Sequence, residues 1–277
     1  MLLLLPMVLS ACNSSGSISG GCEFAGCDFG GTVIDGITQE PSSLLPQRSN
    51  QQFAQLVQTA IRSPLFATDD QGGIVPVLAT EVPSVANGGI SQDGKTLSIH
   101  IRSDARWSNG QPLTADDVLY TINLFRDPAY AARDGYQAAA REIRKVSQPD
   151  PHTIVITLKN VDAAFLALYF TYALAFAPLP KHVYGSMVAS NLVKSDESFK
   201  PTVTNGPFKV SERVPGDQIT VVRDDNLSPS WPAQGVFGQD HLQGLPRCAD
   251  GNPCHPEAAD GYRLLPANRS IRYAVQN

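Results

Sequence analysis

The sequence has few charged side chains and no excess of basic ones. Lys and Arg number 21 against 26 Asp and Glu, which gives a formal net charge of −5, and charged residues make up 17% of the 277 residues. An average soluble chain has roughly 25% charged residues. The missing basic excess argues against a general nucleic-acid-binding protein, which would carry Lys and Arg clustered on one face. We therefore expect no nucleic-acid partner.

Long hydrophobic runs and enzyme motifs are missing as well. The longest apolar run, Met1 to Leu9, is shorter than the ~20 residues that a membrane-spanning helix needs. No Gly-x-Ser-x-Gly, His-Glu-x-x-His, phosphate-binding loop or dinucleotide fingerprint occurs. A secreted enzyme is therefore disfavoured, and we expect no catalytic residue and no cofactor.

The N-terminus has the pattern of an export and anchoring signal. The apolar run is followed by Ser10, Ala11 and Cys12, as in a secretory signal. This ending resembles a bacterial lipobox, whose cysteine becomes the lipid-modified first residue of the mature protein. We expect residues 1–11 to be a lipoprotein signal peptide, residues 12–30 to be a flexible tether, and the protein to be lipid-anchored in the periplasm or on the outer face of the membrane. A plain signal peptide with a chance cysteine is the alternative, and no Lys or Arg precedes Leu2.

Four cysteines remain if Cys12 carries lipid, and export permits them to form disulfides. They can pair in three ways, of which two local loops are the simplest. Cys254-His255 lacks the Cys-x-x-Cys-His spacing of haem attachment, and too few further ligands lie nearby for zinc. We expect no metal site. The disulfide candidates are Cys22, Cys27, Cys248 and Cys254.

Between residues 31 and 226 the patterns of strand and helix are mixed. Apolar residues at helical spacing predict a helix from about Phe53 to Ile61 that ends before Pro64. Alternation of apolar and polar residues predicts half-buried strands. Together the patterns predict a compact mixed α/β domain. The expected strands are 32–37, 97–101, 143–146 and 154–158, followed by a hairpin of 208–210 with 219–222.

A helix start is marked at Thr114. Thr114 and Asp117 have the spacing of a capping box, and Leu113 and Val118 that of a hydrophobic staple. Asp116 and Asp117 also suit the positive end of the helix dipole. We interpret this acidic pair as structural, because adjacent helix residues do not face each other across a substrate.

Five blocks in this order resemble the family 5 extracellular solute-binding proteins, which are components of ABC importers for peptides, nickel or oligosaccharides. The strongest block contains the run WSNGQPLTADDV, and another contains the segment Asn-Gly-Pro-Phe-Lys. The resemblance covers about Gly30 to Asn226. Its blocks are 31–44, 74–79, 91–118, 178–184 and 205–217.

The resemblance implies a binding protein of the type II periplasmic-binding-protein-like fold, in which two α/β lobes enclose a solute and signal closure to a permease. It implies an oligopeptide or similar small solute as ligand and an ABC permease as partner. It also implies that the loop at Glu40-Pro41 and the segment Asn205-Gly206-Pro207 lie on the side of the lobe that faces the ligand cleft. Trp107 could instead be a packing residue, and Gly206 part of a turn. The predicted ligand-binding residues are Glu40, Pro41, Trp107, Asn205, Gly206 and Phe208.

The resemblance stops after Asn226. Residues 227–277 contain six Pro, five Gly and no Lys. We expect an irregular tail, produced by a frameshift or belonging to a short variant. We therefore expect the N-terminal lobe only, with impaired binding. The alternative function is a surface interaction lipoprotein that uses a lone lobe.

Overall fold

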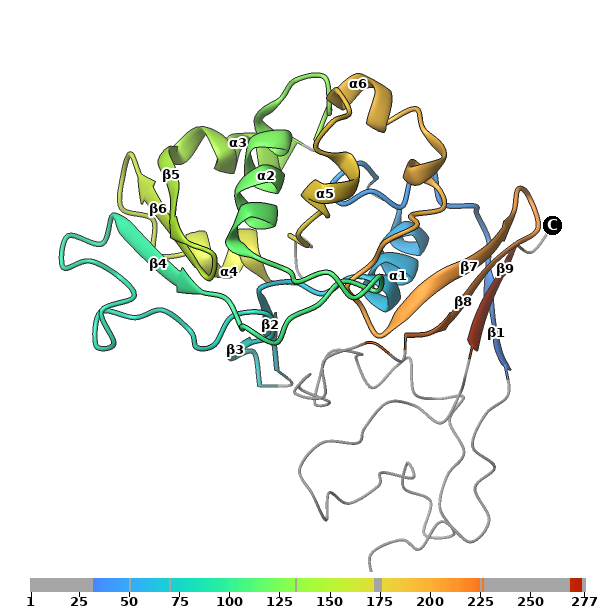
Figure 1. Ribbon diagram of the computed structural model, residues 1–277, viewed down its shortest axis with the longest axis horizontal. Helices are drawn as coiled ribbons and strands as arrows, with labels where there is room; N and C mark the ends of the chain where they lie inside the picture. Colours follow the sequence, from blue (N-terminus) through green and yellow to red (C-terminus); the bar gives the residue numbers. More distant parts are fainter. Residues whose placement is uncertain are drawn as a thin grey trace, which may run out of the picture.

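A four-stranded mixed sheet joins segments from distant parts of the chain (Figure 1). The structure, a computed structural model, describes residues 32–49, 51–69, 71–132, 134–171, 176–224, 226 and 270–275. The sheet has the order β1-β9-β8-β7, with β9 parallel to β1 and antiparallel to β8. Its strands are β1 (Thr32–Ile37), β7 (Phe208–Val214), β8 (Gln218–Arg223) and β9 (Ser270–Val275).

One helix, α1 (Gln52–Ile61), packs against this sheet. The helix ends where the sequence predicts, because Pro64 follows and the cap residue Arg62 is extended. Helix and sheet share the smaller of two hydrophobic cores. That core contains Ile37, Leu44, Val57, Ala60, Ile61, Phe208, Ile219, Val221 and Tyr273.

The larger core lies beneath an antiparallel three-stranded sheet of order β4-β6-β5. Its strands are β4 (Thr96–His100), β5 (Ile143–Asp150) and β6 (Thr153–Leu158). The helices α2 (Ala115–Arg126), α3 (Asp134–Glu142) and α4 (Phe165–Phe170) cover it. Short elements complete the structure: the ribbon of β2 (Phe66–Thr68) with β3 (Ile74–Pro76), the helical turns α5 (Lys181–Tyr184) and α6 (Ala189–Leu192), and a 3-10 turn at Asp196–Ser198.

The predicted local patterns are confirmed. In β4 and β6 buried residues alternate with partly exposed ones, so each strand turns one face to the core. The capping box at the start of α2 is present, with the Thr114 N–H donating to Asp117 Oδ2 at 3.0 Å. Leu113 and Val118 are both fully buried, as a hydrophobic staple requires.

The tail prediction needs a correction. Residues 270–275 are not irregular: they form β9, which lies between β1 and β8. Ile271, Tyr273 and Val275 alternate along the strand and pack into the smaller core, a period-2 pattern that the Pro- and Gly-rich context obscured. Residues 227–269 lie outside the described ranges, and the domain boundary at Asn226 stays a prediction.

The predictions for the N-terminus and for the four disulfide candidates also fall outside the described residues. These are the signal peptide, the tether, the lipidation site Cys12 and the disulfide candidates Cys22, Cys27, Cys248 and Cys254. Among the helices that the structure does describe, none is long and apolar enough to cross a membrane.

Candidate functional site

The loop before β7 is fastened to the end of α1 through Asn205. The Asn205 side chain accepts from the Ser63 N–H at 3.3 Å and donates to the Ser63 carbonyl at 3.1 Å. The Ser63 hydroxyl donates to the Asn205 carbonyl at 2.7 Å. Asn205 is 2% exposed, so its amide is used entirely inside the protein. Since a buried amide needs such partners, this pair fixes the loop to the helix end.

Gly206 sits at the closest approach of the same two segments. Its N–H donates to the Ile61 carbonyl at 3.0 Å. A Cβ atom at this position would lie 2.3 Å from the Ile61 carbonyl carbon and 2.4 Å from the Arg62 nitrogen. Only glycine fits here without moving backbone.

A second loop, residues 107–111, is joined to the same place by Ser108. The Ser108 N–H donates to the Thr204 carbonyl at 2.8 Å, and its hydroxyl accepts from the Thr204 N–H at 3.0 Å. The side chain of Asn226, just past β8, donates to the Ser108 carbonyl at 3.0 Å. We call this meeting place of the α1 end, the 107–111 loop and the 203–208 segment the junction. It connects the two hydrophobic cores.

Trp107 anchors the 107–111 loop in the larger core. Its ring is fully buried, and its Nε1 donates to Asp117 Oδ2 at 3.2 Å. Asp117 also accepts from the backbone N–H of Thr114 and, at 2.9 Å, from that of Lys181. Burial raises the pKa of Asp117, while these three donors act in the opposite direction. The capping carboxylate therefore also joins α2 to Trp107 and to the start of α5.

Glu40 lies elsewhere. Its carboxylate forms an ion pair with Arg213, near the end of β7, and accepts from the Gly216 N–H at 3.0 Å. The junction lies at the start of β7, at Phe208, whereas Arg213 lies near the end of this seven-residue strand. The start and the end of β7 are roughly 20 Å apart, so Glu40 is far from the junction. Pro41 is buried beside Glu40 in the chain.

The structure thus brings together four of the six predicted ligand-binding residues and separates two. Trp107, Asn205, Gly206 and Phe208 meet at the junction, and all four are buried. The exposed side chains beside them were missed by the sequence reasoning. They are Asn109, whose Nδ2 lies 2.9 Å from His182 Nε2, and Gln111. The signal that could have found them is their place two and four residues after Trp107 in the strongest block.

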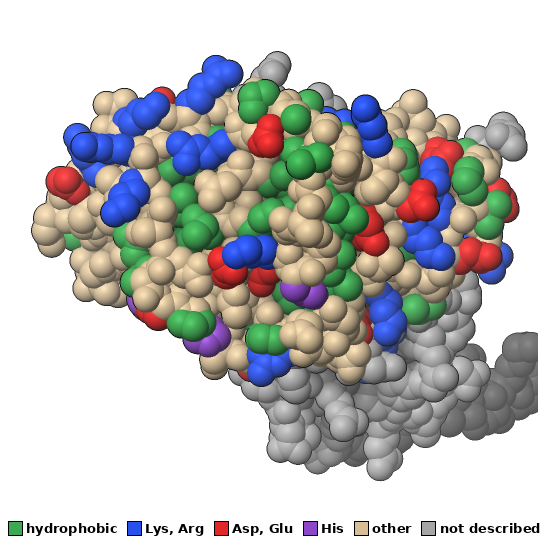
Figure 2. Space-filling view, turned by 45° about the horizontal axis from the view of Figure 1, so that its top comes forward, with side chains coloured by type: hydrophobic (Ala, Val, Ile, Leu, Met, Phe, Trp, Pro, Cys, Tyr) green, Lys and Arg blue, Asp and Glu red, His purple; other side chains and the backbone are tan. Residues whose placement is uncertain are grey.

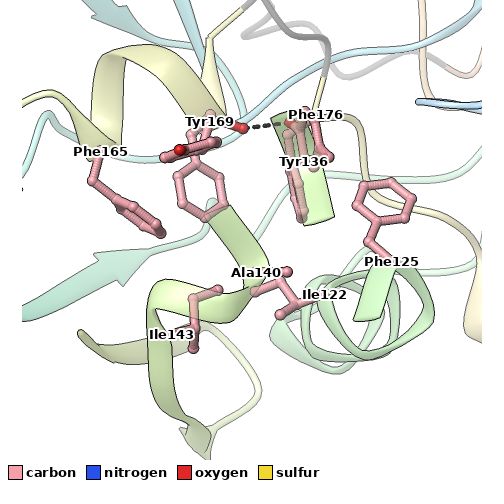
Figure 3. A pocket seen from close by; sticks show the side chains of 9 residues that line it. Ile122, Phe125, Tyr136, Ala140, Ile143, Phe165, Tyr169 and Phe176 are labelled. Carbon is pink, nitrogen blue, oxygen red and sulfur yellow. Dashed lines mark hydrogen bonds between the residues drawn. The ribbon is translucent and has the colours of Figure 1, made fainter. Parts of the chain in front are cut away.

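An apolar cavity lies away from the junction, between α2, α3, α4 and the start of β5 (Figure 3). Its volume is about 20 Å³, enough for about one water molecule. The Tyr136 hydroxyl at its wall donates to the Tyr169 carbonyl. Apolar and aromatic side chains line it: Ile122, Phe125, Tyr136, Ala140, Ile143, Phe165, Tyr169, Phe170 and Phe176. Such a lining offers no polar group to orient a peptide backbone.

The exposed groups at the junction are the amides of Asn109 and Gln111 and the imidazole of His182, which can donate and accept hydrogen bonds. The buried side chains of Ser63, Ser108 and Asn205 are hydrogen-bonded within the junction. Among the described residues no group of three or more His, Cys, Asp or Glu could hold a metal ion.

The two sheets and their helices have the fold of part of a type II periplasmic binding protein. AppA from Bacillus subtilis, an oligopeptide-binding protein solved with a nonapeptide, superposes with a TM-score of 0.66 at 21% identity, over 90% of this chain and 40% of that one. The unliganded open form of the periplasmic murein tripeptide binding protein MppA gives 0.63 at 20% identity, over 89% of this chain and 41% of its own.

The chain belongs to the bacterial extracellular solute-binding proteins, family 5. The family model matches residues 73–240, more than half of the chain. The match runs past Asn226, so the expected end of the resemblance there is wrong. This likeness to binding proteins agrees with the absence of enzyme motifs in the sequence.

Two Bacillus subtilis relatives show the extent of the similarity. The oligopeptide-binding protein AppA is 26% identical over 234 residues, which is 84% of this chain and 41% of that relative. The oligopeptide-binding protein OppA is 28% identical over 240 residues, 81% of this chain and 42% of its own length. The chain therefore spans about two fifths of the length of these two relatives.

Proposed function

We propose that this chain is the solute-binding component of an ABC importer, and that its solute is an oligopeptide or a small molecule of similar size. The observation that carries this proposal is the family match over residues 73–240. Support for the solute class comes from the oligopeptide-binding relatives, which match more than four fifths of the chain. The importer's permease is the proposed partner.

We propose that the junction forms part of the cleft side of the lobe. Trp107, Asn205, Gly206 and Phe208 then act by holding the two loops in place, since their side chains are buried. The ligand would be met by backbone groups of these loops and by the exposed Asn109 and Gln111. Backbone contacts suit an extended peptide because they recognise its main chain and not its sequence. Glu40 and Pro41 would position the β7–β8 hairpin.

Lipid anchoring belongs to the same proposal. Cys12 would carry the lipid, and the chain would be exported and held at the membrane, within reach of the permease. Replacing Cys12 by Ser should move the protein from the membrane fraction to the soluble fraction when the membranes are washed at about 0.5 M salt, which screens electrostatic binding. Retention of this variant on the washed membranes would contradict the anchor and leave the peptide proposal untouched.

We further propose that the 277-residue chain by itself binds peptides weakly. Small-molecule sites bury most of their ligand's surface. In the part of the chain that the structure describes, the junction offers the exposed side chains of Asn109 and Gln111, which can cover a peptide from one side only.

The test is a titration of the purified chain with peptides of three to nine residues, followed by ligand-observed NMR. The expected result is saturable binding with a Kd of about 1 mM or weaker, and no binding of a sugar of similar size. Loss of the signal in Asn109→Ala with Gln111→Ala, but not in Asn87→Ala with Gln92→Ala on a distant loop, would support the junction as the site. Absence of binding at several millimolar peptide contradicts the peptide proposal, and a micromolar Kd contradicts the weak binding.

A further inference from the structure

Five exposed cations gather at one end of the three-stranded sheet. We call them the basic surface: Arg126, Arg141, Arg144, Lys145 and Lys159. Figure 2 shows Lys and Arg side chains concentrated at the upper left of the molecule, the end that carries α3, β5 and β6 in Figure 1. The chain as a whole has a net charge of −5, so this concentration runs against the overall balance.

Backbone contacts place these five residues side by side. The Arg126 guanidinium, at the end of α2, donates to the Ile143 carbonyl at 3.2 Å. Arg141 and Arg144 flank that position in the chain, and Lys145 pairs across to β6 at Thr157. The Lys159 N–H donates to the carbonyl of Glu142 at 2.8 Å. Segments far apart in the chain therefore contribute to one continuous patch.

The patch keeps its positive charge. None of the ion pairs among the described residues involves any of the five cations. The neighbouring acids are engaged with local donors: Asp127 with the Ala129 N–H, Glu142 with the Asn160 amide and Asp162 with the Ala164 N–H. Five cations against these three acids leave an excess of two positive charges in the described part of this surface.

Two exposed aliphatic side chains lie on segments that carry or contact the cationic ones. Val161, two residues after Lys159, is 59% exposed, and Leu168 on α4 is 46% exposed. Helix α4 packs against α3, which carries Arg141. Exposed aliphatic groups next to cations without an ion-pair partner are the combination that interfacial membrane-binding segments use, because the cations meet phosphate groups while the apolar side chains enter the layer beneath.

We propose that the basic surface binds bilayers that contain anionic phospholipids. The surface is rounded rather than hollowed in Figure 2, so it fits a broad anionic sheet better than a small ligand. Binding orients this end of the lobe toward the membrane. The proposal does not depend on the lipid at Cys12 or on peptide binding, because it rests on side chains that lie outside the junction.

The experiment uses the full chain carrying Cys12→Ser, so that no lipid contributes, and vesicles of phosphatidylglycerol mixed with phosphatidylcholine. Cosedimentation is measured for this protein, for Arg144→Gln with Lys145→Gln, and for the matched control Lys194→Gln with Lys200→Gln. Both double variants lose two exposed cations, so they have the same net charge. At about fivefold per cation, the patch variant should bind anionic vesicles about 25-fold less, and the control should bind like the parent.

Three further measurements complete the test. Binding should fall steeply as the salt concentration rises from about 0.05 to about 0.5 M, because salt screens the attraction between exposed charges. Vesicles of pure phosphatidylcholine should bind none of the proteins. Equal binding of the two double variants, or no binding to anionic vesicles at low salt, would overturn the proposal. Full competition by soluble polyglutamate would also overturn it, because the surface would then recognise acidic polymers in general, such as an acidic protein.

Discussion

Replacing Gly206 by Ala tests the contact between the end of α1 and the loop before β7. The added Cβ atom would lie 2.3 Å from the Ile61 carbonyl carbon, 2.4 Å from the Arg62 nitrogen and 2.8 Å from the Ala60 carbonyl oxygen. All three neighbours are backbone atoms at a helix end, and none can swing away as a flexible side chain could. The backbone must therefore separate by about 1 Å to bring the shortest contact, 2.3 Å, to the ordinary 3.4 Å.

This separation has two costs. Overpacking in a filled interior destabilises by about 1–3 kcal/mol. Moving the segments apart also breaks the bond from the Gly206 N–H to the Ile61 carbonyl, which contributes about 1 kcal/mol. We expect Gly206→Ala to lower the free energy of unfolding by about 3 kcal/mol, or the melting temperature by roughly 6–12 °C for a chain of this size.

The matched control is Gly110→Ala, in the loop on the other side of the junction. Gly110 has a φ of +82°, and no neighbouring heavy atom lies within 4 Å of the place that a Cβ would take, so alanine there meets backbone strain without a clash. That strain costs about 1 kcal/mol. Urea unfolding followed by the fluorescence of buried Trp107 compares the two variants. A Gly206→Ala variant no less stable than Gly110→Ala would refute the close contact and with it the fixed junction.

Three more substitutions test the buried network and the last strand. Trp107→Phe keeps an aromatic ring but removes the donor to Asp117 Oδ2, and should cost about 1–2 kcal/mol in urea unfolding; an unchanged midpoint would exclude that bond. Burial raises the pKa of Asp117 above 3.8, so its contribution to stability is complete below pH 3.8 and declines as the pH rises through the folded-state pKa. The stability of the wild type relative to Asp117→Asn, measured by urea unfolding from about pH 3 to about pH 7, should therefore decline with pH, and a rise would contradict the raised pKa. Tyr273→Ala removes a side chain that is 3% exposed in the smaller core and should lower the free energy of unfolding by about 3 kcal/mol or more. A change below about 0.5 kcal/mol, which is usual for surface substitutions, would contradict the buried strand at residues 270–275.

Elements defined by neighbours in the chain were predictable from the sequence. The alternation in β4 and β6 and the Thr114–Asp117 capping box depend on residues two or three positions apart, so their signals are local. The β7–β8 hairpin likewise closes over the short turn at Pro215 and Gly216. These features agree with the structure because local periodicity decided which face of each element is buried.

The position of β9 was not predictable in this way. Thr32 pairs with Ser270, and Val222 pairs with Ser270 from the other side, so the strand is placed by partners far away in the chain. A six-residue alternation at the end of a Pro- and Gly-rich segment is too short to stand out by itself. What makes it a strand is the apolar face of Tyr273 and its neighbours in the core that it shares with α1, which only the folded chain supplies.

The difference between local signals and distant partners also explains which site residues could be predicted. The motif positions Trp107 and Asn205 were found from the sequence, but the direction of their side chains depends on Asp117 and on Ser63, which is 142 residues from Asn205. Those partners turn both side chains inward, so a recognisable motif residue supports the site from beneath. If the junction faces the ligand, affinity should then respond most to the exposed neighbours Asn109 and Gln111. Substitutions at Asn205 or Gly206 should instead lower stability first and binding only as a consequence, and measuring both quantities on the same variants separates these two roles.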